Sequence, residues 1–243
     1  MTCIEAMNDK HKSTMPSRVL INQWKEFIKW YIKRSRNWSI LTKHTADLNN
    51  EVEKLRFLDK AYGLWGDIWH EHDLVLVFAH RLLNYIEEQG LKLHLHVSYR
   101  LKPTNFRFIE EFYDRLSKAV NILRKKLRLT SKWVPEIDLI ITSDKPPFEY
   151  CFEFKYYHYI PVKINPLWDL RRKILVLDIL KKYHVCKNTV LIILDDAICR
   201  KDLVLCNKIK NLLNNESKNL IVLSYYVGYD ELRIELEKHN NSS

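Results

Sequence analysis

Apolar residues recur along the chain with two different periods, and these periods predict which segments are helices and which are strands. Over residues 20–32 large apolar residues follow one another at intervals of three and four, with lysines between them, which is typical of an amphipathic helix. A similar stripe predicts a second helix over about 45–62. Two glycines follow it, so we expect residues 1–62 to form a helical N-terminal extension.

The pattern then alternates between helices and strands, which predicts an α/β domain over residues 63–243. A long helical pattern covers 65–89 and ends at Gly90, a residue suited to a helix C-terminus. Residues 91–99 alternate apolar with polar side chains, as a half-buried strand does. The stripe of a further helix over 105–128 consists of Phe108, Phe112, Leu116, Val120, Leu123 and Leu127.

Residues 134–157 predict a β-hairpin. Its first half is almost continuously apolar, and its second half, from Phe148, alternates aromatic with polar residues. Between them lies the turn sequence 143–147, which ends in two prolines. Beyond the hairpin, the pattern predicts a helix over 167–183, capped by Asn165, and then a buried strand over 189–194. A helix over 202–213, a strand over 220–227 and a last helix over 229–238 follow.

Symmetry about the turn predicts the register of this hairpin. If the turn is centred between Lys145 and Pro146, Asp138 lies opposite Glu153. Directly opposed residues have Cβ atoms about 4.5–5.5 Å apart, so both carboxylates would lie on one side of the sheet. Lys155, two residues beyond Glu153, points to that same side. The aromatic residues of the second strand then point to the other side, into the core.

Two facing carboxylates repel each other unless a cation lies between them. Mg²⁺ is typically held by one or two carboxylates together with water and phosphate oxygens. An ammonium group beside it can orient a water molecule and stabilise the transition state. Asp138, Glu153 and Lys155 therefore suit the hydrolysis of a phosphodiester. The other interpretation, which the spacing leaves open, is an acid at the end of a strand next to an ordinary ion pair.

These residues also resemble the signature of a known family. Asp138 followed, after a gap of fourteen residues, by Glu153-Phe154-Lys155 is similar to the motif of the PD-(D/E)XK nuclease superfamily. The proline–aspartate dipeptide itself is absent, because two residues separate Pro135 from Asp138. Over about residues 65–194, the resemblance implies a restriction-endonuclease-like fold, a mixed central sheet flanked by helices with an αβββαβ core.

The resemblance implies an Mg²⁺- or Mn²⁺-dependent deoxyribonuclease, of endonuclease type. Asp138, Glu153 and the backbone carbonyl of Phe154 would hold the metal ion, and Lys155 would position the attacking water. Glu71 fits the place of the glutamate that completes the site in many members; Asp67 and Asp73 compete for that place, and acids are also favoured near any helix N-terminus. The sequence does not distinguish restriction, repair and junction-resolving nucleases. A non-catalytic nucleic-acid-binding protein on the same fold is the alternative.

The charge of the chain favours DNA as the partner. Forty basic and thirty acidic residues give a net charge of +10. Residues 115–132 contain seven basic residues and no acid, directly before the hairpin. We expect DNA phosphates to be contacted by these seven and by two arginines of the next helix: Arg115, Lys118, Arg124, Lys125, Lys126, Arg128, Lys132, Arg171 and Arg172. A solvated helix face is the simpler alternative. Duplex-cutting members of the family are commonly dimers, which leaves a homodimer open.

The sequence also suggests where the protein acts. Its apolar runs fall short of the roughly 18 residues that span a bilayer, and its start lacks a signal-peptide pattern. We therefore expect no membrane partner. The five cysteines lack the spacing of a disulfide scaffold and are expected to be buried thiols, in keeping with a reducing, cytoplasmic setting.

Overall fold

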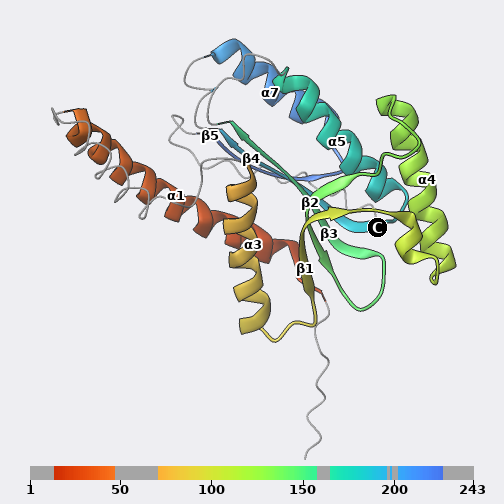
Figure 1. Cartoon of the computed structure of the whole chain (residues 1–243). Coiled ribbons are helices and arrows are strands. Elements are labelled where there is room, and N and C mark those ends of the chain that lie inside the picture. The colour runs from red at the N-terminus through yellow and green to blue at the C-terminus, as the bar shows by residue number, and fades with distance from the viewer. Residues whose placement is uncertain (1–13, 47–70, 158–164, 196–197, 199–201, 227–243) are drawn as a thin grey trace, which may run out of the picture.

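A computed structural model of the chain describes residues 14–46, 71–157, 165–195, 198 and 202–226 (Figure 1). The helix predicted over 229–238 lies outside the described residues. The helix predicted over 45–62 lies outside them as well, apart from its first two residues, which continue the preceding helix.

A five-stranded mixed sheet forms the centre of the molecule (Figure 1). Its strands lie side by side in chain order: β1 (His94–Arg100), β2 (Glu136–Thr142), β3 (Phe148–Tyr157), β4 (Cys186–Asp195) and β5 (Ile221–Tyr226). β2 is antiparallel to both of its neighbours. β4 is parallel to both of its neighbours. Parallel neighbours need a crossover connection, and a helix supplies each one.

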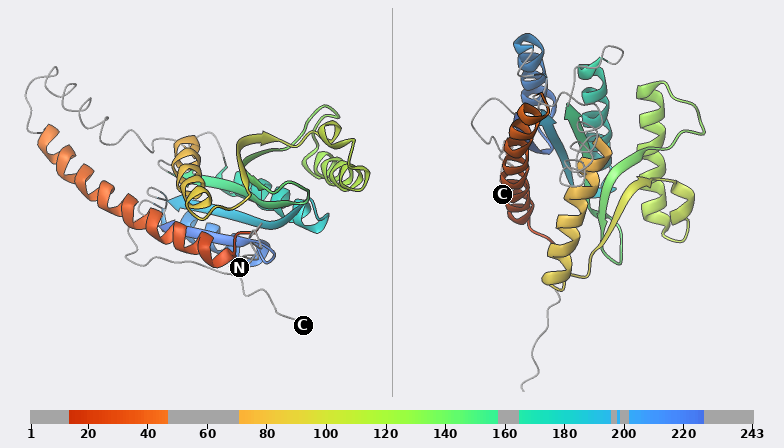
Figure 2. Two further views of the ribbon diagram at one scale, coloured as in Figure 1. Left: turned by 90° about the horizontal axis from the view of Figure 1, so that it is seen from below. Right: turned by 60° about the vertical axis from the view of Figure 1, so that its left-hand side comes forward.

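Helices cover both faces of this sheet (Figures 1 and 2). One face packs against α1 (Ser17–Ala46) and α3 (Glu71–Glu88). The other face packs against α4 (Glu110–Leu127), α5 (Pro166–Lys182) and α7 (Leu203–Glu216). The predicted class, an α/β protein with a mixed sheet between helices, is confirmed.

Local sequence signals fix two helix ends as predicted. The side chain of Asn165 accepts hydrogen bonds from the amides of Leu167 and Trp168, at 3.1 and 3.3 Å, and so caps the start of α5. After α3, Gly90 takes a φ of +58°, a left-handed conformation that glycine adopts without strain. The amide of Leu91 can then bond back to the last turn of α3.

The predicted register of the hairpin is observed. Leu139, Ile140 and Ile141 pair with Phe152, Cys151 and Tyr150, as symmetry about the turn requires. The aromatic side chains of β3 at 152, 154 and 156 lie in the core on the α1–α3 side. Glu153 and Lys155 therefore point to the opposite side, toward α5.

The first part of α1 belongs to the same core as the sheet. Trp24 and Phe27 of α1 are fully buried, and each lies 5.9 Å from Phe78 of α3, measured between ring centroids. Phe78 in turn lies 5.9 Å from Phe154 of β3. This aromatic chain connects α1 to the strand that carries the candidate motif. The C-terminal part of α1 projects beyond the sheet (Figure 2).

The helical stripe predicted over 105–128 is wrong at its first member. Phe108 is 81% exposed, because a 3-10 turn (Pro103–Phe106) precedes α4 and the helix itself begins only at Glu110. Phe108 thus lies ahead of the helix and cannot join its buried face. The stripe is otherwise confirmed: Phe112, Leu116, Val120 and Leu123 are buried, and Leu127 is partly buried.

Cysteine chemistry differs in part from the prediction. Cys151 and Cys186 are free and buried, as expected. Cys206 is disulfide-bonded, so the expectation of thiols alone is wrong there. Among the described helices, none combines the length and the apolar character that crossing a membrane requires.

Candidate active site

The candidate site lies where β2 and β3 diverge. Their backbone pairing ends at Leu139, and beyond it two side-chain carboxylates bond to β3 instead. The amide of Phe154 donates to Asp138 Oδ2 at 2.8 Å, and the amide of Tyr156 donates to Glu71 Oε2 at 3.2 Å. Backbone amides removed from water need an acceptor, so these acids complete the edge of β3.

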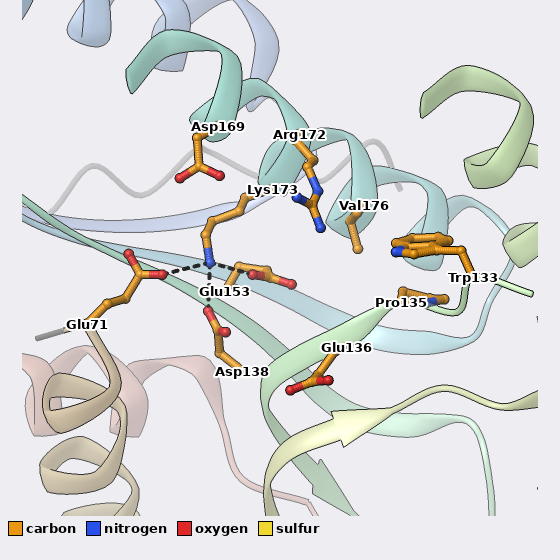
Figure 3. A pocket seen from close by; sticks show the side chains of 10 residues that line it. All are labelled: Glu71, Trp133, Pro135, Glu136, Asp138, Glu153, Asp169, Arg172, Lys173 and Val176. Carbon is orange, nitrogen blue, oxygen red and sulfur yellow. Dashed lines mark hydrogen bonds and ion pairs between the residues drawn. The ribbon is translucent and has the colours of Figure 1, made fainter. Parts of the chain in front are cut away.

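The ammonium group of Lys173 lies at the centre of the site (Figure 3). Its Nζ is 2.8 Å from Glu153 Oε2, 2.9 Å from Asp138 Oδ2 and 3.2 Å from Glu71 Oε1. These acids come from β3, β2 and the first residue of α3, and the lysine comes from α5. Four separate elements therefore meet at one cation.

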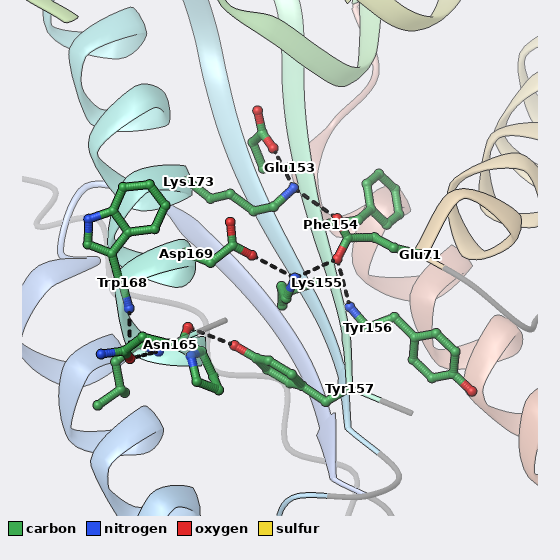
Figure 4. Close-up of polar contacts among 12 residues, drawn as sticks. Glu71, Glu153, Phe154, Lys155, Tyr156, Tyr157, Asn165, Trp168, Asp169 and Lys173 are labelled. Atoms are coloured by element: carbon green, nitrogen blue, oxygen red, sulfur yellow. Dashed lines mark hydrogen bonds and ion pairs between the residues drawn. The ribbon is translucent and has the colours of Figure 1, made fainter. Parts of the chain in front are cut away.

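Lys155 forms a second, adjoining set of contacts (Figure 4). Its Nζ lies 2.6 Å from Asp169 Oδ2 and 3.1 Å from Glu71 Oε2. It also lies 5.6 Å from the centre of the Tyr157 ring. Glu71 therefore contacts both ammonium groups, one with each carboxylate oxygen.

A pocket of about 220 Å³ opens over these residues (Figure 3). The acids and Lys173 form one end of it, and Trp133, Pro135 and Val176 form an apolar end. Arg172 also lines the pocket. Its guanidinium has no ion-pair partner among the described residues and is therefore available to an anion.

Burial and charge shift the pKa values of the two most enclosed groups. Burial raises the pKa of Glu153 to about 8; Lys173 opposes this rise, and the neighbouring carboxylate of Asp138 adds to it. For Lys173, burial lowers the pKa, but attraction to Glu153, Glu71 and Asp138 outweighs burial and raises it well above the ordinary value. Attraction to these acids therefore keeps Lys173 charged.

The charges of the site leave room for a divalent cation. Four carboxylates (Glu71, Asp138, Glu153 and Asp169) surround two ammonium groups, so full ionisation gives these six groups a net charge of two negative units, and the Arg172 guanidinium lines the same pocket. Carboxylate oxygens are the ligands that Mg²⁺ and Mn²⁺ prefer. As they stand, the described residues contain no group of three side chains arranged to hold a metal ion. The point where three carboxylates converge is the position of the Lys173 ammonium.

The structure places the predicted residues in different surroundings. Glu71, Asp138 and Glu153 come together, and Lys155 touches only the first of them. Phe154 contributes its amide to Asp138, while its side chain lies in the core.

Most of the predicted DNA-binding residues lie away from the pocket. Arg115, Arg124 and Arg171 have structural contacts: to Glu111 at 3.8 Å, to the carbonyl of Trp133 at 2.7 Å and to Glu216 at 3.1 Å. Five members on or just after α4 are exposed: Lys118, Lys125, Lys126, Arg128 and Lys132. Arg171 and Arg172 of α5 are exposed as well. Of the nine predicted residues, only Arg172 lines the pocket.

Sequence reasoning missed Asp169 as a member of the site, and it did not predict that Lys173 would contact the acids. Lys173 lies 35 positions from Asp138 and 20 from Glu153, so the local motif gives no sign of it. One signal was present: Asp169 and Lys173 are four residues apart and share a face of α5, with acid before base.

Comparison with known proteins adds no relative. No family model matches the sequence, and no curated protein or solved structure is significantly similar to the chain. The site is therefore interpreted from its own residues.

Proposed function

We propose that the chain is a metal-dependent deoxyribonuclease of the PD-(D/E)XK type, which hydrolyses DNA phosphodiester bonds. The observation that carries this proposal is the convergence of Glu71, Asp138 and Glu153 on a single point beside a pocket. Carboxylates from three elements meet there, although each would be easier to solvate apart. A divalent cation bound between these carboxylates would compensate their negative charges.

The order of the elements supports the proposal. α3, β1, β2, β3, α5 and β4 follow one another in the αβββαβ order of a restriction-endonuclease-like core, with α4 inserted between β1 and β2. The candidate acids occupy the first residue of the core helix, the second strand and the third strand.

The chemistry assigned to each residue follows from its position. Glu71, Asp138 and Glu153 would hold Mg²⁺ or Mn²⁺, which supplies a Lewis acid and an activated water when bound. Lys155, on the same side of β3 as Glu153, is assigned to orient that water. Arg172 would bind a phosphate oxygen at the mouth of the pocket.

DNA would approach from the side of α4. The loop after α4 places Trp133 and Pro135 in the lining of the pocket, and the exposed lysines of α4 precede this loop in the chain. Contacts from lysines to phosphates position a duplex without reading its sequence. One site of this kind cleaves one strand, so cutting both strands of a duplex would use two copies of the chain.

A panel of linear, circular, branched and single-stranded DNA, incubated with Mg²⁺ or Mn²⁺, tests the proposal. Glu153→Gln should lower the cleavage rate on the order of a hundredfold or more, since a neutral amide cannot compensate the cation. Glu149→Gln is the matched control, because Glu149 is a buried acid of the same strand that pairs with Lys187, outside the pocket. Absence of metal-dependent cleavage of every substrate would contradict the proposal.

A non-catalytic nucleic-acid-binding protein is the second candidate, and one observation favours it. Glu71 and Asp138 already have structural partners in the amides of β3 and in Lys173, a role that needs no metal. Calorimetric titration with Mn²⁺ separates the two candidates. The second candidate predicts no binding that Asp138→Ala abolishes, and DNA binding that does not depend on divalent cations.

A further inference from the structure

The further inference concerns Lys173, which no part of the family motif includes. An ammonium group has three N–H donors, and Lys173 has three carboxylate oxygens within 3.2 Å. Its side chain is only 13% exposed. The ammonium is thus fully coordinated by the acids assigned to the metal.

The same oxygens cannot serve both cations. Asp138 Oδ2 and Glu153 Oε2 lie 2.9 and 2.8 Å from Lys173 Nζ, the distances of charge-assisted hydrogen bonds. A divalent cation bound by these atoms would face the ammonium across a few ångströms in a poorly solvated pocket, where like charges repel strongly. Binding one cation therefore disfavours the other.

An alternative partner for the Lys173 ammonium, the carboxylate of Asp169, lies nearby. Its four-carbon side chain is flexible, and Asp169 lies four residues earlier on the same face of α5 (Figure 3). Asp169 already contacts Lys155, so a negative charge is present there whichever lysine it pairs with.

We propose that Lys173 is an internal counter-ion that holds the metal position in the absence of metal and leaves it when a divalent cation binds. This inference rests on the proposed metal-dependent function and adds a regulation of the same site. It explains why three acids from three elements stay together without a metal ion. It also makes metal binding a competition between the ion and a residue of the chain.

Metal affinity is the first test, measured by calorimetry with Mn²⁺ and Mg²⁺ on the full chain. Lys173→Met should bind either ion on the order of tenfold more tightly than the wild type, the scale expected when a partly buried ion pair is removed. Lys187→Met changes the net charge equally, but Lys187 pairs with Glu149 outside the pocket, so it should leave the affinity unchanged.

Thermal stability is the second readout and needs no catalysis. In a chelator, Lys173→Met should melt on the order of 10 °C below the wild type, because three acids lose their shared cation. Mn²⁺ should restore much of this loss in the variant. The Lys187→Met control should show no such restoration.

A third readout uses the wild type alone and holds even if Lys173→Met fails to fold. Reductive methylation followed by mass spectrometry should label Lys173 slowly in chelator and faster when Mn²⁺ is present, while labelling of Lys187 stays constant. Tight Mn²⁺ binding with unchanged affinity in Lys173→Met, or with unchanged labelling of Lys173, would overturn the counter-ion role and leave the proposed function standing. Absence of Mn²⁺ binding in every variant would overturn both.

Discussion

At the scale of single residues, the three acids of the site differ in what else they contact. Asp138 and Glu71 each bond to an ammonium group and to a backbone amide of β3. Glu153 bonds to Lys173, and none of its described contacts is to a backbone amide. Substituting either of the first two therefore removes part of the strand edge together with part of the cation site.

Asp138 allows these two contributions to be separated. Asp138→Ala leaves the Phe154 amide without its acceptor, which should lower the free energy of unfolding by about 1–3 kcal/mol relative to Asp138→Asn. Asparagine keeps an oxygen at that position, while both variants lose the charge. Urea unfolding in chelator measures the difference. Equal stability of the two variants would show that the amide finds another partner.

At the scale of elements, the hairpin was the most predictable part of the molecule. Alternation and the two prolines of the turn determined its register, because a slip of one residue would have turned Phe152 and Phe154 away from the core. The position of α5 over the hairpin could not be predicted in this way. Three consecutive basic residues, 171–173, lie in the first half of α5, and only packing decides that Lys173 alone of the three contacts the acids of the site.

The helix α4 shows a related limit. Its basic run suggested one DNA-binding face, but Arg124 turns back to hold the carbonyl of Trp133, 2.7 Å away. An arginine at the end of a helix can pair with the loop that follows as readily as with a ligand. Lys125 and Lys126, next in sequence, stay exposed.

The exposed lysines of α4 allow the proposed DNA contact to be tested. Lys125→Gln together with Lys126→Gln should weaken binding and flatten its salt dependence by roughly one unit of slope per lost phosphate contact. The control replaces Lys208 of α7 and Lys218 just after it, two exposed lysines. α5 lies between α7 and α4 (Figure 1). Fluorescence anisotropy at several salt concentrations measures both. Equal slopes for the two double variants would place α4 away from the DNA.

At the scale of the whole molecule, the aromatic contacts from Trp24 and Phe27 through Phe78 to Phe154 tie the N-terminal helix to the strand of the candidate motif. We expect the described part of the chain to unfold as one unit, because these side chains share one buried layer. The amphipathic stripe over 20–32 predicted the helix itself. It could not indicate which surface the helix covers, since an apolar stripe does not specify its partner.

Phe27→Ala tests this cooperative unit. It should lower the free energy of unfolding of the whole molecule by about 3–5 kcal/mol, the usual cost of emptying a buried phenylalanine site. Lys29→Ala, on the exposed face of α1, should change it by less than about 0.5 kcal/mol. Circular dichroism and tryptophan fluorescence should give one coincident transition. An early transition in Phe27→Ala, with the main midpoint unchanged, would show that α1 unfolds independently.

The divergence of β2 and β3 has a consequence for how descendants of this sequence would change. If the proposed nuclease activity were lost, selection would still keep Glu71 and Asp138, because both support the backbone of β3. Glu153 has no such contact with a backbone amide among the described residues, so fewer constraints would hold it if that activity were lost. Among homologues, the residue at position 153 would therefore mark the proposed activity better than the residues at positions 71 and 138.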